Sequence, residues 1–273
     1  MAGKLGILSG GGVLPRLLVD ACRSNGRDVF VLAFEGHTLP ETTEGVDHAW
    51  VRLGAAGTAM DILKAAGVAD VVLAGPVRRP SLAELRPDGR GLKLLAKAGA
   101  RALGDDGLLR AVIVELEREG FTIVGIDDVL HGMTATAGAL GRFEPDAGAL
   151  VDIRRGVDVL RHLGAVDVGQ AVVVQEGIVL GIEAAEGTDG LIARCASLAR
   201  EGPGGVLVKL RKPGQESRVD LPTIGPETVR GARDAGLRGI AVEAGATLVL
   251  SLETAIREAD AAGLFLTGIS VPE

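Results

Sequence analysis

Short apolar runs alternate with helix-spaced apolar segments along most of this chain. The first run, Lys4 to Ser9, leads into Gly10-Gly11-Gly12, and helix-spaced apolar residues follow from Val13 to Ser24. A second apolar run, Asp28 to Phe34, comes next. A strand, a tight turn, a helix and another strand in this order are typical of a parallel sheet covered by helices. The alternation therefore predicts an α/β protein with a doubly wound sheet in its N-terminal part.

The composition agrees with buried parallel strands. Hydrophobic residues make up 47% of the chain, but aromatic residues only 2%, and tyrosine is absent. The core must therefore consist of Val, Leu, Ile and Ala, as in strands that are buried on both faces. The formal net charge of −7 argues against a nucleic-acid partner that binds through a broad basic surface.

The sequence lacks the usual signatures of several classes of protein. Cys22 and Cys195 lie far apart, and the histidines show no metal-binding spacing, so neither a disulfide framework nor a zinc site is predicted. No apolar run reaches the roughly 18 residues of a membrane span, and no signal peptide is recognisable at the N-terminus. We expect a cytoplasmic protein.

The regular alternation fades between residues 132 and 148, where Gly, Ala, Thr and Pro dominate. We therefore predict a Rossmann-like domain over residues 1–133, a linker over 134–148 and a second α/β domain over 149–273. A 273-residue chain is long enough for two such domains. The expected helices of the second domain lie at about 149–163, 189–200, 226–235 and 252–262, and its strands near 169–175, 178–184, 205–208, 239–243, 246–250 and 264–269.

The turn Gly10-Gly11-Gly12 is a candidate nucleotide site. Glycines after a strand let the main chain approach a phosphate, and the following helix offers N–H donors. However, Pro15 stands where a dinucleotide fingerprint has a small residue, and the Lys-Ser/Thr pair of a P-loop is missing. We favour nucleotide binding over a ligand-free turn, because Gly75-Pro76-Val77-Arg78 follows another strand of the same domain. Arg78 would then balance phosphate charge, although arginines in loops are often only solvated.

A dense polar loop follows the apolar run Gly205–Val208. It begins with Lys209 and continues through Gln215-Glu216-Ser217-Arg218-Val219-Asp220-Leu221-Pro222-Thr223-Ile224-Gly225. Loops after strands are where α/β proteins place their chemistry, although most polar loops are solvated surface. We favour a functional loop, because Val219 and Leu221 should hold Asp220 against packed structure.

A second candidate lies at the start of the expected helix 189–200. Thr188 or Asp189 is expected to cap this helix, and Gly187 would allow a ligand to approach its N-terminus, which favours anions. Repulsion from Glu183, Glu186 and Asp189 would have to be offset by a divalent ion or by Lys209.

Taken in order, these segments resemble the UDP-2,3-diacylglucosamine pyrophosphatase family of lipid A biosynthesis, in the form unrelated to the metallophosphoesterases. The resemblance covers essentially the whole chain. It is carried by Ser9-Gly10-Gly11-Gly12 with Leu14-Pro15, Ala74-Gly75 with Arg79-Pro80, Gly89-Arg90-Gly91-Leu92-Lys93, Gly104-Asp105-Asp106 with Leu108-Leu109-Arg110, Asp167-Val168-Gly169-Gln170, Glu183-Ala184 with Glu186-Gly187-Thr188-Asp189, and Gln215-Glu216 through Gly225.

The resemblance implies Mg²⁺-dependent hydrolysis of UDP-2,3-diacylglucosamine to UMP and 2,3-diacylglucosamine 1-phosphate (lipid X), with residues 149–273 as the catalytic domain. The family's essential aspartate falls on Asp220, which we expect to hold the metal or orient the attacking water, with Asp189 as a second metal ligand. The expected substrate-binding residues are Gly10, Gly11, Gly12, Gly75, Pro76, Val77, Arg78, Thr134, Thr188, Asp189, Lys209, Gln215, Arg218 and Thr223.

Because this substrate is a membrane lipid, we expect transient contact with the inner-membrane surface, with peripheral attachment as an option beside a purely cytoplasmic location. The oligomeric state is left open, with a homodimer among the options. Two other functions stay open as well. One is an NAD-dependent oxidoreductase, which rests on the glycine turn and on Glu35 as a ribose-binding acid. The other is a non-catalytic protein that binds a nucleotide sugar or lipid.

Overall fold

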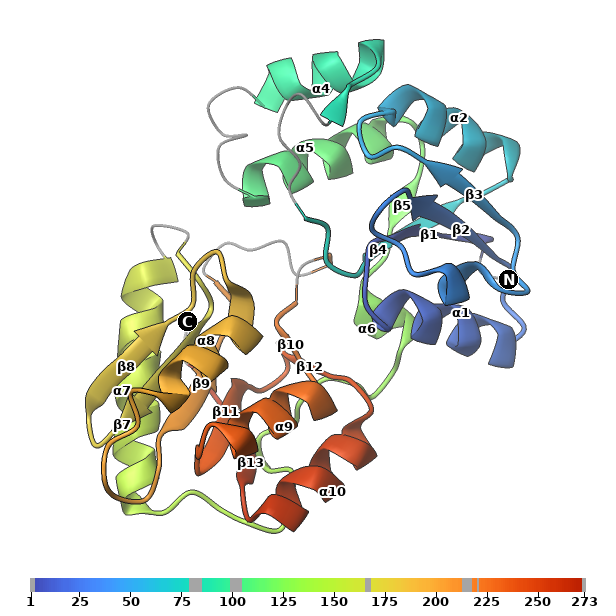
Figure 1. Ribbon diagram of the computed structural model, residues 1–273. Coiled ribbons are helices and arrows are strands. Elements are labelled where there is room, and N and C mark those ends of the chain that lie inside the picture. Colours follow the sequence, from blue (N-terminus) through green and yellow to red (C-terminus); the bar gives the residue numbers. More distant parts are fainter. Residues whose placement is uncertain are drawn as a thin grey trace. The chain divides into compact units, whose positions relative to one another are not determined.

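The computed structural model describes residues 3–78, 85–98, 105–164, 168–212, 218–219 and 221–271 (Figure 1). The chain forms two compact units. Unit 1 comprises Met1–Leu130 together with Glu216–Val219, and unit 2 comprises His131–Gln215 and Asp220–Glu273. Each unit contains a sheet with helices on both faces, so the predicted α/β class is confirmed for both.

Unit 1 is built on a parallel sheet of order β3-β2-β1-β4-β5. Rossmann-type sheets share this order, and their ligands bind beyond the carboxyl ends of the strands, where the strand order reverses between β1 and β4. The strands contain the apolar runs on which the prediction rested, because burial on both faces favours Val, Leu and Ile. Their bounds are β1 Leu5–Ser9, β2 Val29–Phe34, β3 His48–Val51, β4 Asp70–Ala74 and β5 Thr122–Ile123.

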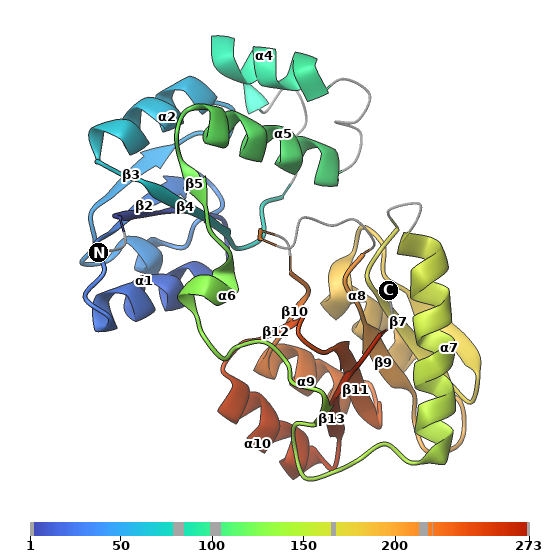
Figure 2. The ribbon, with the colours of Figure 1, turned by 180° about the vertical axis from the view of Figure 1, so that it is seen from behind.

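The helices of unit 1 cover both faces of this sheet. Figures 1 and 2 show α1 (Leu14–Ser24) and α6 (Ile126–Val129) on one face and α2 (Ala56–Ala65), α4 (Gly89–Ala98) and α5 (Asp105–Arg118) on the other. A short 3₁₀ turn, η1 (Pro40–Thr43), lies beside α1. The hydrophobic core beneath α2 and α5 also contains Val219, which comes from the C-terminal half of the chain.

Unit 2 has a mixed sheet of order β6-β13-β11-β9-β7-β8. Strands β9, β11 and β13 are parallel to one another, whereas β7 is antiparallel to both β9 and β8, and β6 is antiparallel to β13. A second, two-stranded sheet pairs β10 with β12. The bounds are β6 Gly138–Ala139, β7 Ala171–Gln175, β8 Ile178–Ile182, β9 Val206–Lys209, β10 Thr223–Ile224, β11 Gly239–Glu243, β12 Leu248–Val249 and β13 Phe265–Ile269.

The helices of unit 2 are divided unequally between the faces of its sheet. Helix α7 (Ala147–Gly164) covers one face, and α8 (Gly187–Ala196), α9 (Pro226–Asp234) and α10 (Leu252–Ala262) cover the other (Figure 2). Within the described ranges, no helix combines the length and the apolar character that crossing a membrane requires.

One detail differs from the sequence prediction. Residues 134–148, predicted as a linker, lie in unit 2, where Gly138–Ala139 forms β6 against β13 and Ala147 begins α7. The apolar pattern of the sequence does not indicate β6, because this short exposed strand needs no apolar residues. The start of α2 is held by a residue from a later part of the chain. The helix begins at Ala56, and the carboxylate of Asp88 accepts hydrogen bonds from the N–H groups of Gly57 and Thr58.

Candidate functional site

The two glycine segments of unit 1 lie against each other at the carboxyl ends of β1 and β4. The N–H of Gly10 donates to the Ala74 carbonyl, and the N–H of Gly11 donates to the Pro76 carbonyl, each at 2.8 Å. A Cβ atom on Gly10 would lie 2.4 Å from the Gly75 carbonyl oxygen. A Cβ on Gly75, whose φ is +87°, would lie 2.2 Å from the Gly11 oxygen. The sequence prediction grouped these segments, and the structure shows that their glycines are needed for close packing of the two turns.

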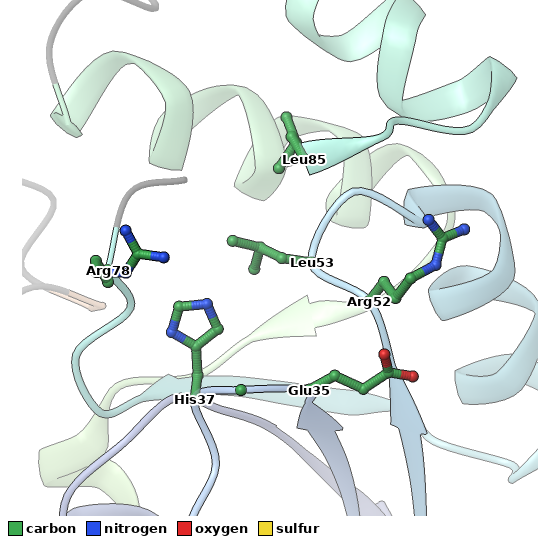
Figure 3. A pocket seen from close by; sticks show the side chains of 7 residues that line it. Glu35, His37, Arg52, Leu53, Arg78 and Leu85 are labelled. Carbon is green, nitrogen blue, oxygen red and sulfur yellow. The ribbon is translucent and has the colours of Figure 1, made fainter. Parts of the chain in front are cut away.

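A cavity of about 220 Å³ opens beyond the carboxyl ends of the neighbouring strands (Figure 3). Figure 3 shows His37 and Arg78 on one side of this cavity and Glu35 and Arg52 on the other, with Leu53 between them. The remaining lining residues are Gly36 and Leu85. The volume suits a phosphate or a sugar ring, and arginine is the side chain best matched to a phosphate.

Local hydrogen bonds fix the β2 end of this cavity. The hydroxyl of Thr38 accepts a hydrogen bond from the Phe34 N–H at 2.8 Å and donates to the Ser9 carbonyl at 2.5 Å. The turn between these residues is closed by the His37 N–H, which donates to the Phe34 carbonyl at 3.0 Å. These bonds tie the end of β2 to the end of β1 and so hold His37 at the cavity.

The sequence prediction included Arg78 but missed His37 and Arg52 as possible ligand contacts. Each of these residues follows a strand of a parallel sheet. Their positions just after the end of a strand could have identified them from the sequence as candidate ligand contacts. Val77, in contrast, is exposed beside the cavity rather than part of its lining.

In unit 2, three predicted residues form one hydrogen-bonded network. Lys209 ends β9 and is only 5% exposed. Its ammonium group donates to the Thr188 hydroxyl and to the Thr223 carbonyl, each at 2.8 Å. Since β8 and β9 are both antiparallel to β7, their carboxyl ends lie at one edge of the sheet, which brings the start of α8 to Lys209.

The network continues to a buried carboxylate. The hydroxyl of Thr188 donates to Glu183 Oε1 at 2.7 Å, and Glu183 Oε2 accepts from the Gln170 N–H at 2.9 Å. Glu183 is 6% exposed, so its charge is compensated inside the protein by these donors and by the nearby Lys209 ammonium group. The side-chain oxygen of Gln170 is buried without a hydrogen-bond partner beside this network.

The start of α8 is not capped as predicted. Glu186 occupies the N-cap position, no side chain caps the helix, and Thr188 turns to Glu183 instead. The expected repulsion from Glu186 is reduced, because Arg194 binds its carboxylate at 2.6 Å and this hydrogen bond lowers the pKa of Glu186. Asp189 lies in the first turn with an exposed side chain.

Thr134 lies beside the small sheet that contains Thr223. Leu248 pairs with Thr223 in parallel and with Thr134 in an isolated antiparallel bridge. The structure therefore brings together Thr134 and Thr223, which are distant in sequence. The chain just before Thr223 is held here as well, because the Leu248 N–H donates to the Pro222 carbonyl at 2.8 Å.

Other predicted residues lie elsewhere. Gln215 and Asp220 are outside the described residues. Arg218 belongs to unit 1, where its guanidinium group binds Glu117 at 2.9 Å. Among the residues that the structure describes, no group of at least three His, Cys, Asp or Glu side chains could hold a metal ion.

The comparisons with known proteins cover both units. The family model described as the LpxI N-terminal domain matches residues 4–133, and that of the LpxI C-terminal domain matches residues 136–267. The UDP-2,3-diacylglucosamine pyrophosphatase LpxI of Caulobacter vibrioides is 43% identical over 279 residues, which cover 99% of each chain. Among solved structures, CobK precorrin-6A reductase aligns with a TM-score of 0.37 at 12% identity, over 100% of this chain and 89% of its own.

Proposed function

The chain belongs to the LpxI family, and from this we propose that it hydrolyses the pyrophosphate bond of UDP-2,3-diacylglucosamine, giving UMP and lipid X in lipid A biosynthesis. The observation that carries this proposal is the 43% identity to a pyrophosphatase of that name over 99% of both chains. The match includes both units, so it extends beyond a shared nucleotide-binding fold, which alone would not indicate the reaction.

Hydrolysis of a pyrophosphate needs charge neutralisation and a well-placed water molecule more than covalent catalysis. One water oxygen forms a bond to a phosphorus atom, the bond from that phosphorus to the bridging oxygen breaks, and each product carries a phosphate. We assign the positioning of this water to Asp220, the essential aspartate of the family, which lies outside the described residues.

The network around Lys209 supports a phosphate-binding role for the N-terminal end of α8. A helix N-terminus attracts anions, and the buried ammonium group of Lys209 adds a full positive charge next to Thr188. In this proposal, Thr188 and Asp189 lie at the phosphate, and Thr223, Thr134 and Gln215 provide hydrogen bonds to the phosphate or sugar.

Unit 1, taken by itself, contains a candidate nucleotide-binding cavity. The cavity is lined by Arg78, Arg52 and His37 together with one carboxylate, Glu35, so its two guanidinium groups outnumber the negative charge and suit an anionic part of the nucleotide. The turns at Gly10–Gly12 and Gly75–Val77 form the adjoining main chain, and they pack closely against each other. This cavity supports nucleotide binding by unit 1 without a dinucleotide fingerprint.

We propose Mg²⁺ as the cofactor. Magnesium usually takes one or two carboxylates and completes its shell with phosphate oxygens and water, so a cluster of three acidic side chains is not required. The exposed carboxylate of Asp189 at the start of α8 fits as one such ligand, and Asp220 is the other residue that would hold the ion. When bound, Mg²⁺ would neutralise charge on the pyrophosphate.

The substrate also sets the proposed location. A diacylated sugar resides in a membrane, so a protein without a spanning helix in its described part would meet it at the surface. We propose a cytoplasmic protein that contacts the inner membrane transiently. Recovery in both the soluble fraction and the membrane fraction of broken cells is the expected result, and it would shift toward the membrane when substrate accumulates.

The decisive experiment is UMP release from UDP-2,3-diacylglucosamine by the intact chain, with Mg²⁺ or with EDTA. We expect equal amounts of UMP and lipid X, loss of both with EDTA, and loss of both in Asp220→Ala. Asp234→Ala is the matched control, since Asp234 lies at the surface in an ion pair with Arg233. Tight binding of the lipid nucleotide without any UMP would instead support a binding protein, and binding of NADH alone would support the oxidoreductase.

A further inference from the structure

Glu183 is a buried carboxylate beside the candidate phosphate site of unit 2. It directly follows β8 and is 6% exposed, so water can offset little of its negative charge. A buried charge is costly unless hydrogen-bond donors are directed at it. Two donors meet this carboxylate, the Thr188 hydroxyl at 2.7 Å and the Gln170 N–H at 2.9 Å. Donors from two different segments of the chain therefore hold it in one orientation.

The main chain at Glu183 is packed tightly against the segment that precedes β7. A Cβ atom on Gly169, whose φ is +56°, would lie 2.0 Å from the Glu183 carbonyl oxygen. The carbonyl of Gln170 accepts a hydrogen bond from the N–H of Leu210, the residue after Lys209, at 3.0 Å. The segment that holds the Glu183 carboxylate is thus also bonded to the end of β9. These contacts fix the carboxylate near Lys209.

The hydrogen bonds of the Thr188 hydroxyl can run in only one direction. A carboxylate only accepts hydrogen bonds, an ammonium group only donates them, and a hydroxyl has a single proton. Between two charged neighbours, the Thr188 proton must therefore point to Glu183, and the Thr188 oxygen must accept from Lys209 at 2.8 Å. In this arrangement the Thr188 hydroxyl has no proton left to donate to a phosphate. It links the two charges instead.

We propose that Glu183 is a positioning residue for the Lys209 ammonium group: it takes the Thr188 proton and so turns the hydroxyl oxygen toward Lys209. This inference rests on the proposed pyrophosphatase function, in which the charge of Lys209 acts on a substrate phosphate. The carbonyl of Thr223 is a second acceptor for the ammonium group, at 2.8 Å. A carboxylate repels a phosphate, so Glu183 acts through Thr188 and does not contact the substrate.

Two substitutions interrupt this link at different points. Glu183→Gln keeps the shape of the side chain but removes its charge, and Thr188→Val removes the hydroxyl between the two charges. Each should lower kcat/KM for UMP release about tenfold, the effect of losing one hydrogen bond to a charged group. Because both act through Lys209, the doubly substituted protein should be no slower than the slower single variant. Thr188→Ser keeps the hydroxyl and should retain most of the native kcat/KM.

Asp152→Asn is the matched control for the loss of a buried charge in unit 2. Asp152 of α7 is 2% exposed, and its carboxylate accepts a hydrogen bond from the Gly177 N–H at 2.7 Å. This substitution should lower the melting temperature without changing kcat or KM. If the Thr188 hydroxyl instead donates to the phosphate, Glu183→Gln should leave kcat/KM unchanged, or the losses should multiply in the doubly substituted protein. Either result would overturn the positioning role.

Proton–nitrogen NMR of lysine ammonium groups supplies a readout that does not require activity. The buried, hydrogen-bonded ammonium group of Lys209 should exchange its protons slowly and give a signal that is absent from Lys209→Met. We expect this signal to broaden or vanish in Glu183→Gln and in Thr188→Val, and to remain in Thr188→Ser and Asp152→Asn.

Two NMR results would count against the inference: no Lys209 signal in the native protein, or an unchanged signal in Glu183→Gln. If Glu183→Gln does not fold, Thr188→Val and Thr188→Ser provide the same comparison. A signal that responds as expected, in a chain that releases no UMP, would overturn the proposed function and leave the positioning of Lys209 by Glu183 standing.

Discussion

At the scale of single residues, Lys209 joins more of the candidate site than any other side chain described above. Its ammonium group connects Thr188 at the start of α8 with Thr223 in β10. Lys209→Met would leave these acceptors without a buried donor, which costs about 1–3 kcal/mol for each unsatisfied group. We expect a lower melting temperature together with loss of most UMP release.

The control for Lys209→Met is Lys97→Met, because Lys97 is an exposed lysine in an ion pair on the surface of unit 1. It should change neither quantity measurably. A Lys209→Met protein with native melting temperature and native kcat would contradict the role of the network. Thr188→Val tests the next link, since it removes the hydroxyl that joins Lys209 to Glu183 while keeping the shape of the side chain.

Gly75 tests the packing of the two glycine turns. Both Gly75 and Gly67 have positive φ, +87° and +70°, but only at Gly75 would a Cβ collide with another part of the main chain, 2.2 Å from the Gly11 oxygen. Gly67→Ala should therefore cost only the left-handed strain of about 1–2 kcal/mol. Gly75→Ala should cost clearly more in urea unfolding, and equal costs would show that the turns can separate without penalty.

At the scale of elements, one carboxylate organises two helices of unit 1. Asp88 accepts hydrogen bonds from the N–H groups of Gly57 and Thr58 in α2 and from those of Arg90 and Gly91 in α4. Burial acts to raise the pKa of Asp88, but these hydrogen bonds, led by that from Gly91, together hold it below its usual value. Removing the side chain should therefore loosen both helix starts.

We expect Asp88→Ala to lower the free energy of unfolding by about 1–2 kcal/mol at pH 7, the usual effect of losing a helix cap. Since the folded pKa is depressed, this contribution is present above the unfolded value of 3.8 and is lost as the pH falls through the folded pKa. The difference between native and variant protein in urea unfolding should thus shrink below about pH 4. Asp61→Ala, at an exposed position on α2, should show no such difference at either pH.

The contacts of Asp88 are also an example of structure that the sequence alone does not predict. Periodicity located most helices and strands, because burial of one face leaves a local pattern. The hydrogen bond to the start of α2 comes from a residue 31 positions away, and β6, near the middle of the chain, pairs with β13 near its C-terminal end. Such long-range contacts leave no local pattern. For the same reason, Lys209, Thr188 and Thr223 could be named singly, but their network, and the cavity residues His37 and Arg52, required the structure.

At the scale of the whole molecule, the two units are linked by more than the connection near residue 130. Val219 completes the core of unit 1, but the chain on both sides of Glu216–Val219 belongs to unit 2. When unit 2 unfolds, these flanking segments lose their anchors. If Val219 is then to stay in the core of unit 1, a longer flexible chain has to be closed into a loop, which costs conformational entropy. The stability of unit 1 should therefore depend on the folding of unit 2.

Trp50, the single tryptophan of the chain, lies in β3 and reports on unit 1. Ile240→Ala removes a 1% exposed side chain from the core of unit 2 and should destabilise that unit by about 2–5 kcal/mol. We expect the midpoint of the Trp50 fluorescence change in urea to move to lower denaturant as well. Leu198→Ala, at a 45% exposed position in unit 2, should leave that midpoint in place. An unmoved Trp50 transition in Ile240→Ala, beside an earlier loss of helical circular dichroism, would show that the units unfold independently.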